Sequence, residues 1–422
     1  MSGETIVIVG GGQAGGEIAV QLRKLGHAGP VTLVADEPHV PYKRPPLSKA
    51  YLAGEAAVES LYVIPRASLD KAGVELKLGA RVTKIDRSAH RVQLADGSSI
   101  AYGKLALATG GRPRGLSLPG ADRANARLSS AGFSNVFPLR TIADVDAIRA
   151  RCKPGARMVI VGGGFIGLEV AAVAIKRGLK VTVLEGLPRV LARVAVPQVS
   201  AFFERVHREA GVDLRTGAQL AALEGEPEVR RVVLGDGTAI DCDLMVIGIG
   251  IVPNVELAVE AGLAVDNGIV VDEQTRTSDP DIVAAGDCTS HPSAFAGRRI
   301  RLESVQNALE QGRAAAATLA GKPAPYQTVP WFWSDQYDLK LQMVGLSAGH
   351  DRCVFRGDPA TGRSFAAFYL RDGVLIAADT VNRAADFMFA KKLVASGARI
   401  DAAVLADEGV ALKSLLPASA PA

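Results

Sequence analysis

The amino-acid sequence predicts an α/β fold in which two similar βαβ domains are followed by a smaller α+β domain. Segments 5–37 and 157–186 share one design: a short apolar strand, a glycine-rich turn, an alanine-rich helix and a second apolar strand. After Trp331 the pattern changes to alternating strands followed by a helix near 384–395. The length of 422 residues is sufficient for about three domains.

Composition and charge limit the kinds of protein this chain can be. Hydrophobic residues make up 48% of the sequence and charged residues 22%, which is typical of a globular protein and excludes a mainly disordered chain. The net charge of +4 is too small to indicate a nucleic-acid-binding protein, but it is compatible with an acidic partner docking on a local basic patch. Four cysteines, none in a C-x-x-C arrangement, exclude a disulfide scaffold.

Neither a secretory signal nor a membrane span is expected. Residues 1–5, MSGET, contain no basic n-region, and the apolar run that follows ends at Gly10. No apolar run approaches the ~20 residues that cross a bilayer. We therefore expect a cytoplasmic protein with no membrane partner.

Both βαβ units contain the spacing Gly-x-Gly-x-x-Gly between the first strand and the helix. The first loop contains Gly10, Gly12 and Gly15, and the second contains Gly162, Gly164 and Gly167. In such a loop one glycine makes a tight turn, one lets the backbone approach a pyrophosphate, and one lets helix and strand pack closely. The N-terminus of the helix then faces the phosphates.

An acidic residue follows each loop at the end of the second strand. Asp36 lies 24 residues after Gly12, and Glu185 lies 21 residues after Gly164, which is typical of a carboxylate that binds a ribose. One such loop is weak evidence because a tight turn needs no ligand. Two loops, each with its strand, helix and acid, predict two Rossmann-like dinucleotide-binding domains.

Two dinucleotide sites indicate a permanently bound flavin adenine dinucleotide and an exchanging nicotinamide nucleotide, because two nicotinamide sites have little chemical purpose. Glu185 favours NADH, since a carboxylate accepts hydrogen bonds from a free 2′-hydroxyl and repels a 2′-phosphate. Arg189 is the competing observation. It lies four residues later and is either a phosphate-binding cation or a solvated loop charge.

The sequence resembles the putidaredoxin reductase-like ferredoxin reductases of bacterial oxygenase systems. These belong to the FAD-dependent pyridine nucleotide-disulfide oxidoreductase superfamily but lack its redox cysteine pair. The matching segments are PYKRPPLSKAYLAG at 41–54, ALATGGRPR at 106–114, GGGFIGLEVAA at 162–172, VSAFFERVHREAGVDLRTG at 199–217, TSDPDIVAAGDC at 277–288, ESVQNALEQGR at 303–313 and PWFWSDQY at 330–337. The resemblance covers essentially the whole chain, and the last two segments are the most specific.

The resemblance implies a function and a division into domains. It implies an FAD flavoprotein that accepts a hydride from NADH and passes single electrons to a 2Fe–2S ferredoxin. That ferredoxin would serve a haem-thiolate monooxygenase or a ring-hydroxylating dioxygenase. The implied domains are an FAD-binding domain formed by 1–114 and 248–328, an NADH-binding domain at 115–247 and an interface domain at 329–422.

The resemblance also assigns site residues where its motifs match. Lys49 falls beside the flavin and Glu169 approaches the flavin and the nicotinamide, so these are the expected catalytic residues. Phe165 stands where relatives often have a tyrosine stacked over the ring. The other implied FAD contacts are Gly10, Gly12, Ala14, Gly15, Asp36, Arg44, Val82, Ala108, Arg140, Asp287, Val305 and Trp333. The implied nicotinamide contacts are Gly162, Gly164, Ile166, Gly167 and Glu185.

Simpler interpretations of these residues remain open. Lys49 and Glu169 would form a buried ion pair, which is costly to desolvate and so favours a functional role over two surface charges. Phe165 and Trp333 can instead be core packing, and Asp287 can be a turn or helix N-cap residue. No metal site is expected, because the six histidines are scattered and the chain lacks ligand clustering.

Other functions compete with the leading hypothesis. Disulfide reductases and single-cysteine peroxidases of similar fold require a cysteine near the flavin, but the corresponding segment 39–49, HVPYKRPPLSK, contains none. Cys288, next to Asp287, is expected to be a small buried residue. A diaphorase that reduces quinones or oxygen, and a flavoprotein that acts as a redox-sensing binding module, remain as alternatives. Multiple-turnover electron flux to a ferredoxin distinguishes them from a ferredoxin reductase.

Overall fold

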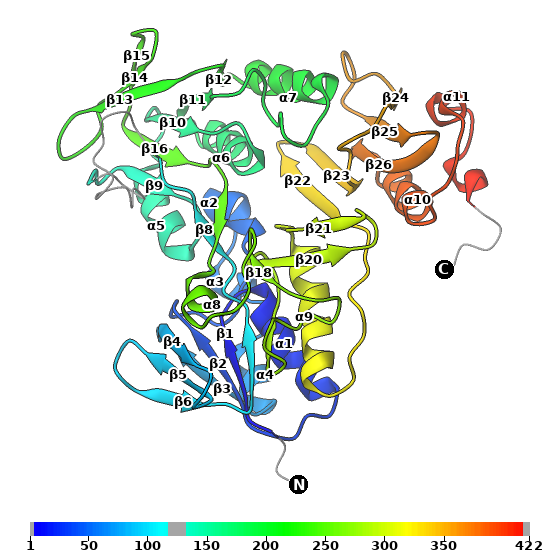
Figure 1. Cartoon of the computed structure of the whole chain (residues 1–422). Helices are drawn as coiled ribbons and strands as arrows, with labels where there is room; N and C mark the ends of the chain where they lie inside the picture. Colours follow the sequence, from blue (N-terminus) through cyan, green and yellow to red (C-terminus); the bar gives the residue numbers. More distant parts are fainter. Residues whose placement is uncertain (1–3, 117–131, 417–422) are drawn as a thin grey trace. The chain divides into compact units, whose positions relative to one another are not determined.

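The computed structural model describes residues 4–116 and 132–416 (Figure 1). The chain divides into two compact units. Unit 1 consists of 1–43, 58–112 and 252–330, and unit 2 consists of 44–57, 113–251 and 331–422. The expectation of no secretory signal rests partly on residues 1–3, which lie outside the described ranges. Within the described ranges, no helix combines the length and apolarity that a membrane span requires.

The centre of unit 1 is a five-stranded parallel sheet in the order β19-β7-β1-β2-β3. Its strands are β1 (Ile6–Val9), β2 (Val31–Ala35), β3 (Val74–Leu78), β7 (Lys104–Leu107) and β19 (Ile282–Ala284). Alternate residues of β1 enter two different cores. Ile6 and Ile8 pack with helices α1 (Gln13–Lys24) and α9 (Val305–Leu319), whereas Val7 and Val9 pack on the opposite face. Burial on both faces explains why the strand is apolar throughout.

Smaller elements complete unit 1. The strands β4 (Val82–Asp86), β5 (Arg91–Leu94) and β6 (Ser99–Ala101) form an antiparallel sheet. The strands β18 (Ile269–Val270), β20 (Thr289–Ser293) and β21 (Arg298–Ile300) form a mixed sheet, in which β20 pairs with β18 in parallel and with β21 in antiparallel orientation. The short helices are α3 (Val58–Leu61), α4 (Arg66–Lys71) and α8 (Glu256–Glu260). Strands β8 (Gly111–Pro113) and β17 (Ile251–Pro253) form a two-stranded pair where the chain passes between the units.

Unit 2 contains a second five-stranded parallel sheet in the order β12-β11-β10-β16-β9. Its strands are β9 (Val136–Pro138), β10 (Arg157–Val161), β11 (Lys180–Glu185), β12 (Asp213–Thr216) and β16 (Leu244–Ile247). The helical elements of this part are η1 (Pro45–Ser48), α2 (Ala50–Ala53), α5 (Ile142–Arg151), α6 (Phe165–Lys176) and α7 (Pro197–Glu209). A small antiparallel sheet is formed by β13 (Leu220–Glu224), β14 (Arg231–Leu234) and β15 (Ala239–Asp241).

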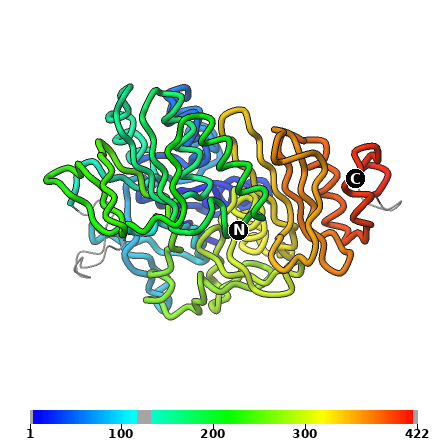
Figure 2. Tube along the Cα trace, turned by 90° about the horizontal axis from the view of Figure 1, so that it is seen from above, coloured from blue at the N-terminus to red at the C-terminus, as the bar shows by residue number. Residues whose placement is uncertain are grey.

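The C-terminal part of unit 2 is an antiparallel sheet in the order β22-β23-β26-β25-β24, drawn in orange shades in Figures 1 and 2. Its strands are β22 (Trp331–Gln336), β23 (Leu339–Gly345), β24 (Arg352–Arg356), β25 (Phe365–Arg371) and β26 (Val374–Val381). Helices α10 (Ala384–Ala395) and α11 (Ala402–Ala406) and the turn η3 (Leu412–Leu415) follow.

The predicted fold class is confirmed. Both βαβ repeats form parallel sheets, and the segment after residue 330 forms a separate α+β arrangement. The expected hairpin at Asp372–Gly373 joins β25 to β26, with φ of +51° and +76° at the two turn residues. Such left-handed angles at both positions are typical of a tight hairpin turn.

Helix α5 begins with a reciprocal cap that also fixes the backbone of Arg140. Thr141 Oγ1 accepts a hydrogen bond from the Asp144 amide, while Asp144 Oδ2 accepts from the amides of Thr141 and Arg140. Thr141→Ala should therefore lower the local stability of α5 by about 1 kcal/mol, or about fivefold in amide exchange rate. Hydrogen-exchange mass spectrometry of the peptide covering 142–151 measures this effect. Thr141→Ser retains the hydroxyl and should exchange like the wild type; equal exchange of both variants contradicts the role of the cap.

Candidate functional site

The first glycine loop in unit 1 brings backbone segments closer together than a side chain would permit. Gly10 has φ of +125°, and a Cβ atom there would lie 2.1 Å from the carbonyl oxygen of Ala108. A Cβ atom at Gly15 would lie 2.0 Å from the carbonyl oxygen of Gly10. These two positions therefore require glycine so that strand β1, strand β7 and helix α1 can meet.

The N-terminus of α1 has the features of a dinucleotide phosphate site. Gly12 is the N-cap residue, no side chain caps it, and the space where its Cβ would stand is open to 4 Å. The first amides of a helix point outward and form the positive end of its dipole. Gln13 Oε1 is buried without a hydrogen-bond partner among the described residues, so this oxygen can accept a hydrogen bond from a ligand. An open space beside amide donors fits a pyrophosphate.

Further unit 1 residues expected at the flavin lie in the turn after β19 and at the start of α9. The Gly286–Asp287 turn follows β19, and a Cβ atom at Gly286 would lie 3.2 Å from the Cβ of Ala14. Gln311 Oε1 on α9 fixes this turn, because it accepts from the Gly286 amide at 2.8 Å. The N-cap residue of α9 is Ser304, so the alternative of Asp287 as a helix N-cap is wrong. Val305 is the first residue of α9.

The predicted ribose carboxylate Asp36 directly follows β2. Asp36 forms an ion pair with Arg81 at 3.5 Å between Oδ2 and Nη2, and both side chains are largely exposed. Val82, where the adenine contact is expected, directly follows Arg81 and is buried at the start of β4. Asp36 therefore lies beside the loop that precedes Val82, with an exposed carboxylate at the carboxyl edge of the sheet.

The second glycine loop in unit 2 repeats this geometry. Gly162 has φ of +111°, and a Cβ at Gly167 would lie 2.0 Å from the carbonyl oxygen of Gly162. Gly164 is an N-cap residue without a side-chain cap and with open space where its Cβ would be. Ile166, the second residue of α6, exposes 40% of its surface, which leaves this end of the helix accessible. A second dinucleotide phosphate fits this loop for the same reasons.

Glu185 and Arg189 have different roles in this loop region. Glu185 Oε2 accepts from the Gly163 amide at 2.6 Å, and Oε1 accepts from the Leu187 amide at 2.8 Å. The carboxylate is thus fixed at the glycine loop and keeps lone pairs for further donors. Arg189 donates to the carbonyl oxygens of Ala192 and Ala195 and to Ser200 Oγ. Its guanidinium anchors a local loop, so it is neither a solvated charge nor a free phosphate-binding cation.

The two expected catalytic residues meet in unit 2. Lys49 Nζ lies 2.6 Å from Glu169 Oε2, and the Glu169 side chain is only 2% exposed. Ser48 Oγ donates to the same oxygen at 2.5 Å, and Ser334 Oγ donates to Oε1 at 2.6 Å. The carboxylate on α6 is therefore surrounded by donors from η1 and β22. The ion pair was expected from the sequence, whereas neither serine was.

Aromatic side chains and two arginines complete the unit 2 part. The rings of Phe165 and Phe332 have centroids 4.8 Å apart, so Phe165 contacts strand β22. The ring centroids of Trp331 and Trp333 are 5.5 Å apart, and the Trp333 side chain is partly exposed rather than fully buried. In the 44–57 segment, Arg44 Nη1 donates to the carbonyl oxygen of Arg140.

The thiols are not placed for redox chemistry. All four cysteines are free, and Cys152, Cys242 and Cys288 are buried. Burial raises the pKa of Cys152 and Cys288, and it raises the pKa of Cys242 and Cys353 to about 12. Since the thiolate is the reactive form, none of these thiols is activated. The expected burial of Cys288 is confirmed.

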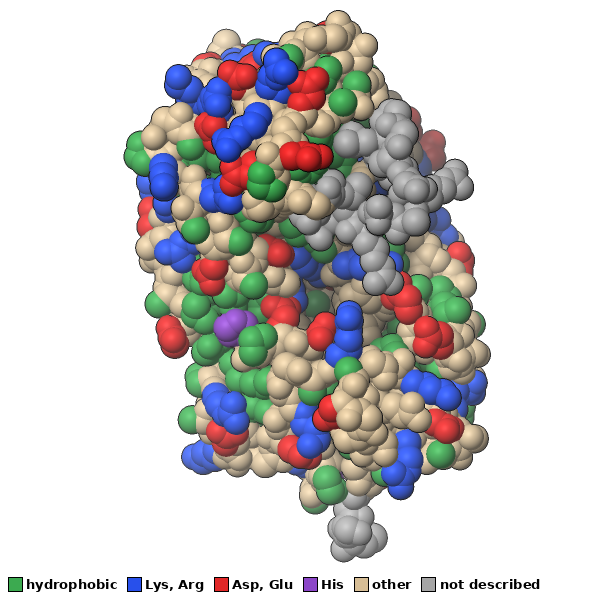
Figure 3. Space-filling model, turned by 90° about the vertical axis from the view of Figure 1, so that its left-hand side faces the viewer, with side chains coloured by type: hydrophobic (Ala, Val, Ile, Leu, Met, Phe, Trp, Pro, Cys, Tyr) green, Lys and Arg blue, Asp and Glu red, His purple; other side chains and the backbone are tan. Residues whose placement is uncertain are grey.

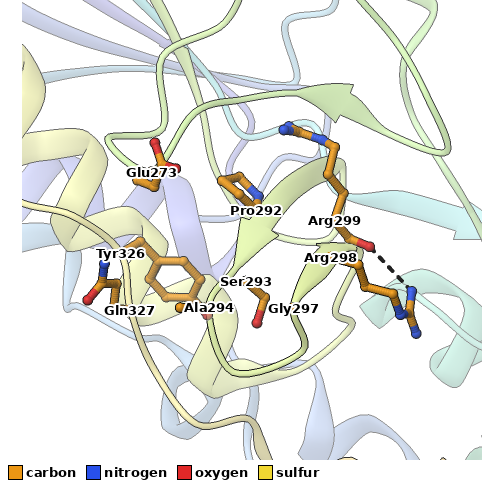
Figure 4. A pocket seen from close by; sticks show the side chains of 9 residues that line it. All are labelled: Glu273, Pro292, Ser293, Ala294, Gly297, Arg298, Arg299, Tyr326 and Gln327. Carbon is orange, nitrogen blue, oxygen red and sulfur yellow. Dashed lines mark hydrogen bonds between the residues drawn. The ribbon is translucent and has the colours of Figure 1, made fainter.

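Neither a metal cluster nor the cavity in unit 1 offers an alternative site. Among the described residues, no group of three or more His, Cys, Asp or Glu side chains is arranged to bind a metal ion. A cavity of about 390 Å³ lies beside β20 and β21 (Figure 4). Arg298 points away from Tyr326 there, and Arg299 donates to the carbonyl oxygens of Val271 and Ser290. The cavity therefore lacks a convergent set of polar groups.

Comparisons with known proteins give one consistent result. The pyridine nucleotide-disulphide oxidoreductase family matches residues 4–312, and the reductase C-terminal family matches residues 331–416. The chain is 48% identical to the ferredoxin reductase subunit of 5,5′-dehydrodivanillate O-demethylase from Sphingobium sp., covering 98% of each chain. It is 46% identical to putidaredoxin reductase from Pseudomonas putida, covering 99% of this chain and 97% of the relative. Among solved structures, it matches the covalent putidaredoxin reductase–putidaredoxin complex with a TM-score of 0.93, 46% identity and 98% coverage of both chains.

The glycine loops allow ligand binding and folding to be separated by mutation. Gly12→Ala should fold normally but retain much less flavin, because its methyl group enters the open space that fits the pyrophosphate. Gly15→Ala should fail to fold, because its Cβ would collide with the Gly10 carbonyl. The flavin-to-protein absorbance ratio and circular dichroism measure the two effects. Gly235→Ala is the control, because its Cβ would make only van der Waals contacts at 3.6 Å or more. Full flavin retention in Gly12→Ala contradicts the proposed phosphate site.

Proposed function

Because the chain belongs to the pyridine nucleotide-disulphide oxidoreductase family, we infer that it is an NADH-dependent, FAD-containing ferredoxin reductase. It accepts a hydride from NADH and passes single electrons to a 2Fe–2S ferredoxin. That ferredoxin serves a haem-thiolate monooxygenase or a ring-hydroxylating dioxygenase. The inference depends chiefly on the similarity over almost the full length, including the C-terminal domain, to the ferredoxin reductase components of an O-demethylase and of an anthranilate 1,2-dioxygenase system.

The two glycine loops support the binding of FAD and NADH by different segments of the chain. We propose that residues 1–114 and 248–328 bind FAD, that 115–247 bind NADH, and that 329–422 form a C-terminal interface domain. When bound, FAD supplies the chemistry that converts a two-electron hydride donor into a source of single electrons. In unit 1, Gly10, Gly12, Ala14 and Gly15 would bind its pyrophosphate. Asp36, Val82, Ala108, Asp287 and Val305 would provide the remaining unit 1 contacts.

In unit 2, Lys49 and Glu169 are the proposed catalytic residues. A carboxylate that is 2% exposed, paired with a lysine and bonded to two serines, is costly to bury and is typical of a functional site. Hydride transfer itself requires no acid–base residue, so the pair would orient the nicotinamide and tune the flavin. Arg44, Arg140, Phe165 and Trp333 are the further unit 2 residues that we propose to contact the cofactors.

Glu185 is the proposed determinant of NADH preference. Gly162, Gly164, Ile166 and Gly167 would bind the nucleotide phosphates, and the Glu185 carboxylate would accept from the ribose 2′-hydroxyl. The hydrogen bonds that Arg189 donates to Ala192, Ala195 and Ser200 support this proposal, because they engage the arginine that the sequence suggested as a partner for a 2′-phosphate.

Electron transfer to an external acceptor agrees with the state of the thiols. The family name includes disulfide chemistry, yet burial raises the pKa of every cysteine. Four unpaired cysteines also favour a reducing compartment, and we therefore place the protein in the cytoplasm.

Basic residues that could contact an acidic ferredoxin differ in whether they already form an ion pair within the chain. Arg313 pairs with Glu17 at 2.8 Å, and Arg301 pairs with Glu303. Arg298 is exposed and donates only weakly, at 3.3 Å, to the carbonyl oxygen of Arg299. On the face drawn in Figure 3, Lys and Arg side chains are interspersed with Asp and Glu side chains. Docking is therefore proposed to depend on local charges such as Arg298.

Electron flux to ferredoxin tests the proposed function. NADH-driven reduction of cytochrome c should rise strongly when a 2Fe–2S ferredoxin is added, and this rate should fall several-fold between about 20 and 300 mM salt, because screening weakens docking. Reduction of ferricyanide should hardly change with salt. Arg298→Glu should raise the apparent KM for ferredoxin, whereas Arg66→Glu, a charge reversal on the exposed surface of α4, should not. A flux that does not depend on ferredoxin contradicts the function.

Nucleotide preference tests Glu185 separately. The wild type should prefer NADH to NADPH. Glu185→Gln should reduce that preference roughly tenfold to a hundredfold, because an amide oxygen accepts from the ribose hydroxyl less strongly than a carboxylate and does not repel a 2′-phosphate. Steady-state kcat/KM with each nucleotide measures the change. Arg193→Gln, an exposed position in the same loop region, is the control. A wild type that prefers NADPH would falsify this role of Glu185.

A further inference from the structure

A chain of hydrogen bonds runs from Glu169 to the surface of unit 2. Ser334 Oγ lies 2.6 Å from Glu169 Oε1, and Gln336 Nε2 lies 3.1 Å from Ser334 Oγ. His207 Nε2 lies 2.9 Å from Gln336 Oε1, and the Tyr337 hydroxyl lies 3.0 Å from His207 Nδ1. Ser334, Gln336 and His207 are buried, whereas Tyr337 exposes 37% of its surface. The chain therefore links a buried carboxylate to a partly exposed phenol.

The carboxylate at one end determines the direction of every bond. A carboxylate only accepts, so the Ser334 hydroxyl donates to Glu169 and its oxygen accepts from the Gln336 amide group. Gln336 Oε1 must then face His207, which donates through Nε2–H. The remaining nitrogen, Nδ1, accepts from the Tyr337 hydroxyl. Each donor points toward Glu169, and aligned bonds of this kind strengthen one another.

The chain requires a neutral histidine with a single tautomer. Burial lowers the pKa of His207 to about 4, so the ring is neutral near pH 7. A neutral imidazole has one donor and one acceptor, which the two neighbours of His207 match. The charge on Glu169 thereby specifies which nitrogen of a ring three hydrogen bonds away carries the proton.

The fold places these side chains by strand alternation and by a strained turn. Ser334 and Gln336 are two residues apart on β22 and so point to the same face. The next residue, Tyr337, opens the two-residue turn between β22 and β23 and has φ of +54°. Bulky residues are disfavoured at such left-handed angles, where glycine is less costly. A tyrosine at this position is consistent with a role for its hydroxyl.

We propose that Ser334, Gln336 and His207 are positioning residues for hydride transfer, which act by fixing the orientation of the Glu169 carboxylate. This inference rests on the proposed function of Glu169. Ser48 and Lys49 both bond to Oε2, so among the described residues Ser334 is the one that donates to Oε1. The chain behind Ser334 keeps its hydroxyl directed at the carboxylate. Without this chain, Glu169 would retain its partner lysine but lose its defined rotation.

The His207 tautomer gives a readout that does not depend on turnover. In the wild type at pH 7, ¹⁵N NMR of histidine-labelled protein should show neutral His207 protonated at Nε2. In Glu169→Gln, the amide oxygen should face Lys49 and Ser48, so its NH₂ group faces Ser334 and every bond in the chain reverses. His207 should then be protonated at Nδ1. The buried His291 of unit 1 should not change.

Kinetics test whether the chain acts through Glu169. Ser334→Ala should lower the limiting rate of flavin reduction by NADH about tenfold in stopped flow, with little change in the apparent Kd for NADH or in flavin content. Gln336→Leu and Tyr337→Phe should act in the same direction, with a smaller effect for Tyr337→Phe. Thr380→Val removes a buried hydroxyl from β26 of the same sheet and should leave the rate unchanged.

A double-mutant comparison completes the test. Ser334→Ala should have no further effect in the Glu169→Gln background, because the chain acts only through the carboxylate. An equal effect in both backgrounds, or an unchanged His207 tautomer in Glu169→Gln, overturns the proposal. If Glu169→Gln slows reduction and Ser334→Ala does not, the chain is rejected and the role of Glu169 stands. If Glu169→Gln itself leaves the rate unchanged, both residue roles are rejected, while ferredoxin-dependent flux still decides the overall function.

Discussion

The burial of the Glu169 carboxylate is the constraint that organises unit 2. A carboxylate removed from water is stable only when charged or polar donors surround it. Those donors come from segments far apart in the sequence: Lys49 and Ser48 from the 44–57 segment and Ser334 from β22. Each of them must therefore be held against α6, which itself begins at the second glycine loop. The position of one charge thus connects the second glycine loop, the 44–57 segment and the C-terminal sheet.

The glycine loops depend on a different kind of constraint. At Gly15 and Gly167 the backbone approaches so closely that a Cβ would lie 2.0 Å from a carbonyl oxygen, so the residue type is dictated by contact distance. At Gly12 and Gly164 the structure alone would tolerate a methyl group, because nothing lies within 4 Å. Glycine at the latter positions is therefore better explained by a ligand than by the fold. This contrast separates the requirements of folding from those of binding within one motif.

The parts of the structure that were predictable from sequence are those encoded locally. Glycine spacing, strand periodicity and the Asp372–Gly373 turn each follow from a few adjacent residues, and all three are present in the fold. Lys49 and Glu169 were identified only through family resemblance, because 120 residues separate them. Ser334, Gln336 and His207 carried no local signal, since their contacts depend on how β22 packs against α6 and α7. The role of Arg189 was ambiguous because its partners are two backbone carbonyls and the hydroxyl of Ser200, which no sequence pattern marks.

The state of the cysteines explains how a fold shared with disulfide reductases can pass electrons to an external acceptor. Thiol chemistry needs a thiolate, and burial raises the pKa of each cysteine in this chain. The segment 39–49, where a redox cysteine would be expected, instead provides Ser48 and Lys49 as donors to Glu169. A site without a redox disulfide cannot pass the electron pair to cysteines of its own chain. Electrons that arrive together as a hydride must then leave for an external acceptor, and a one-electron carrier such as a 2Fe–2S ferredoxin requires two successive encounters per hydride.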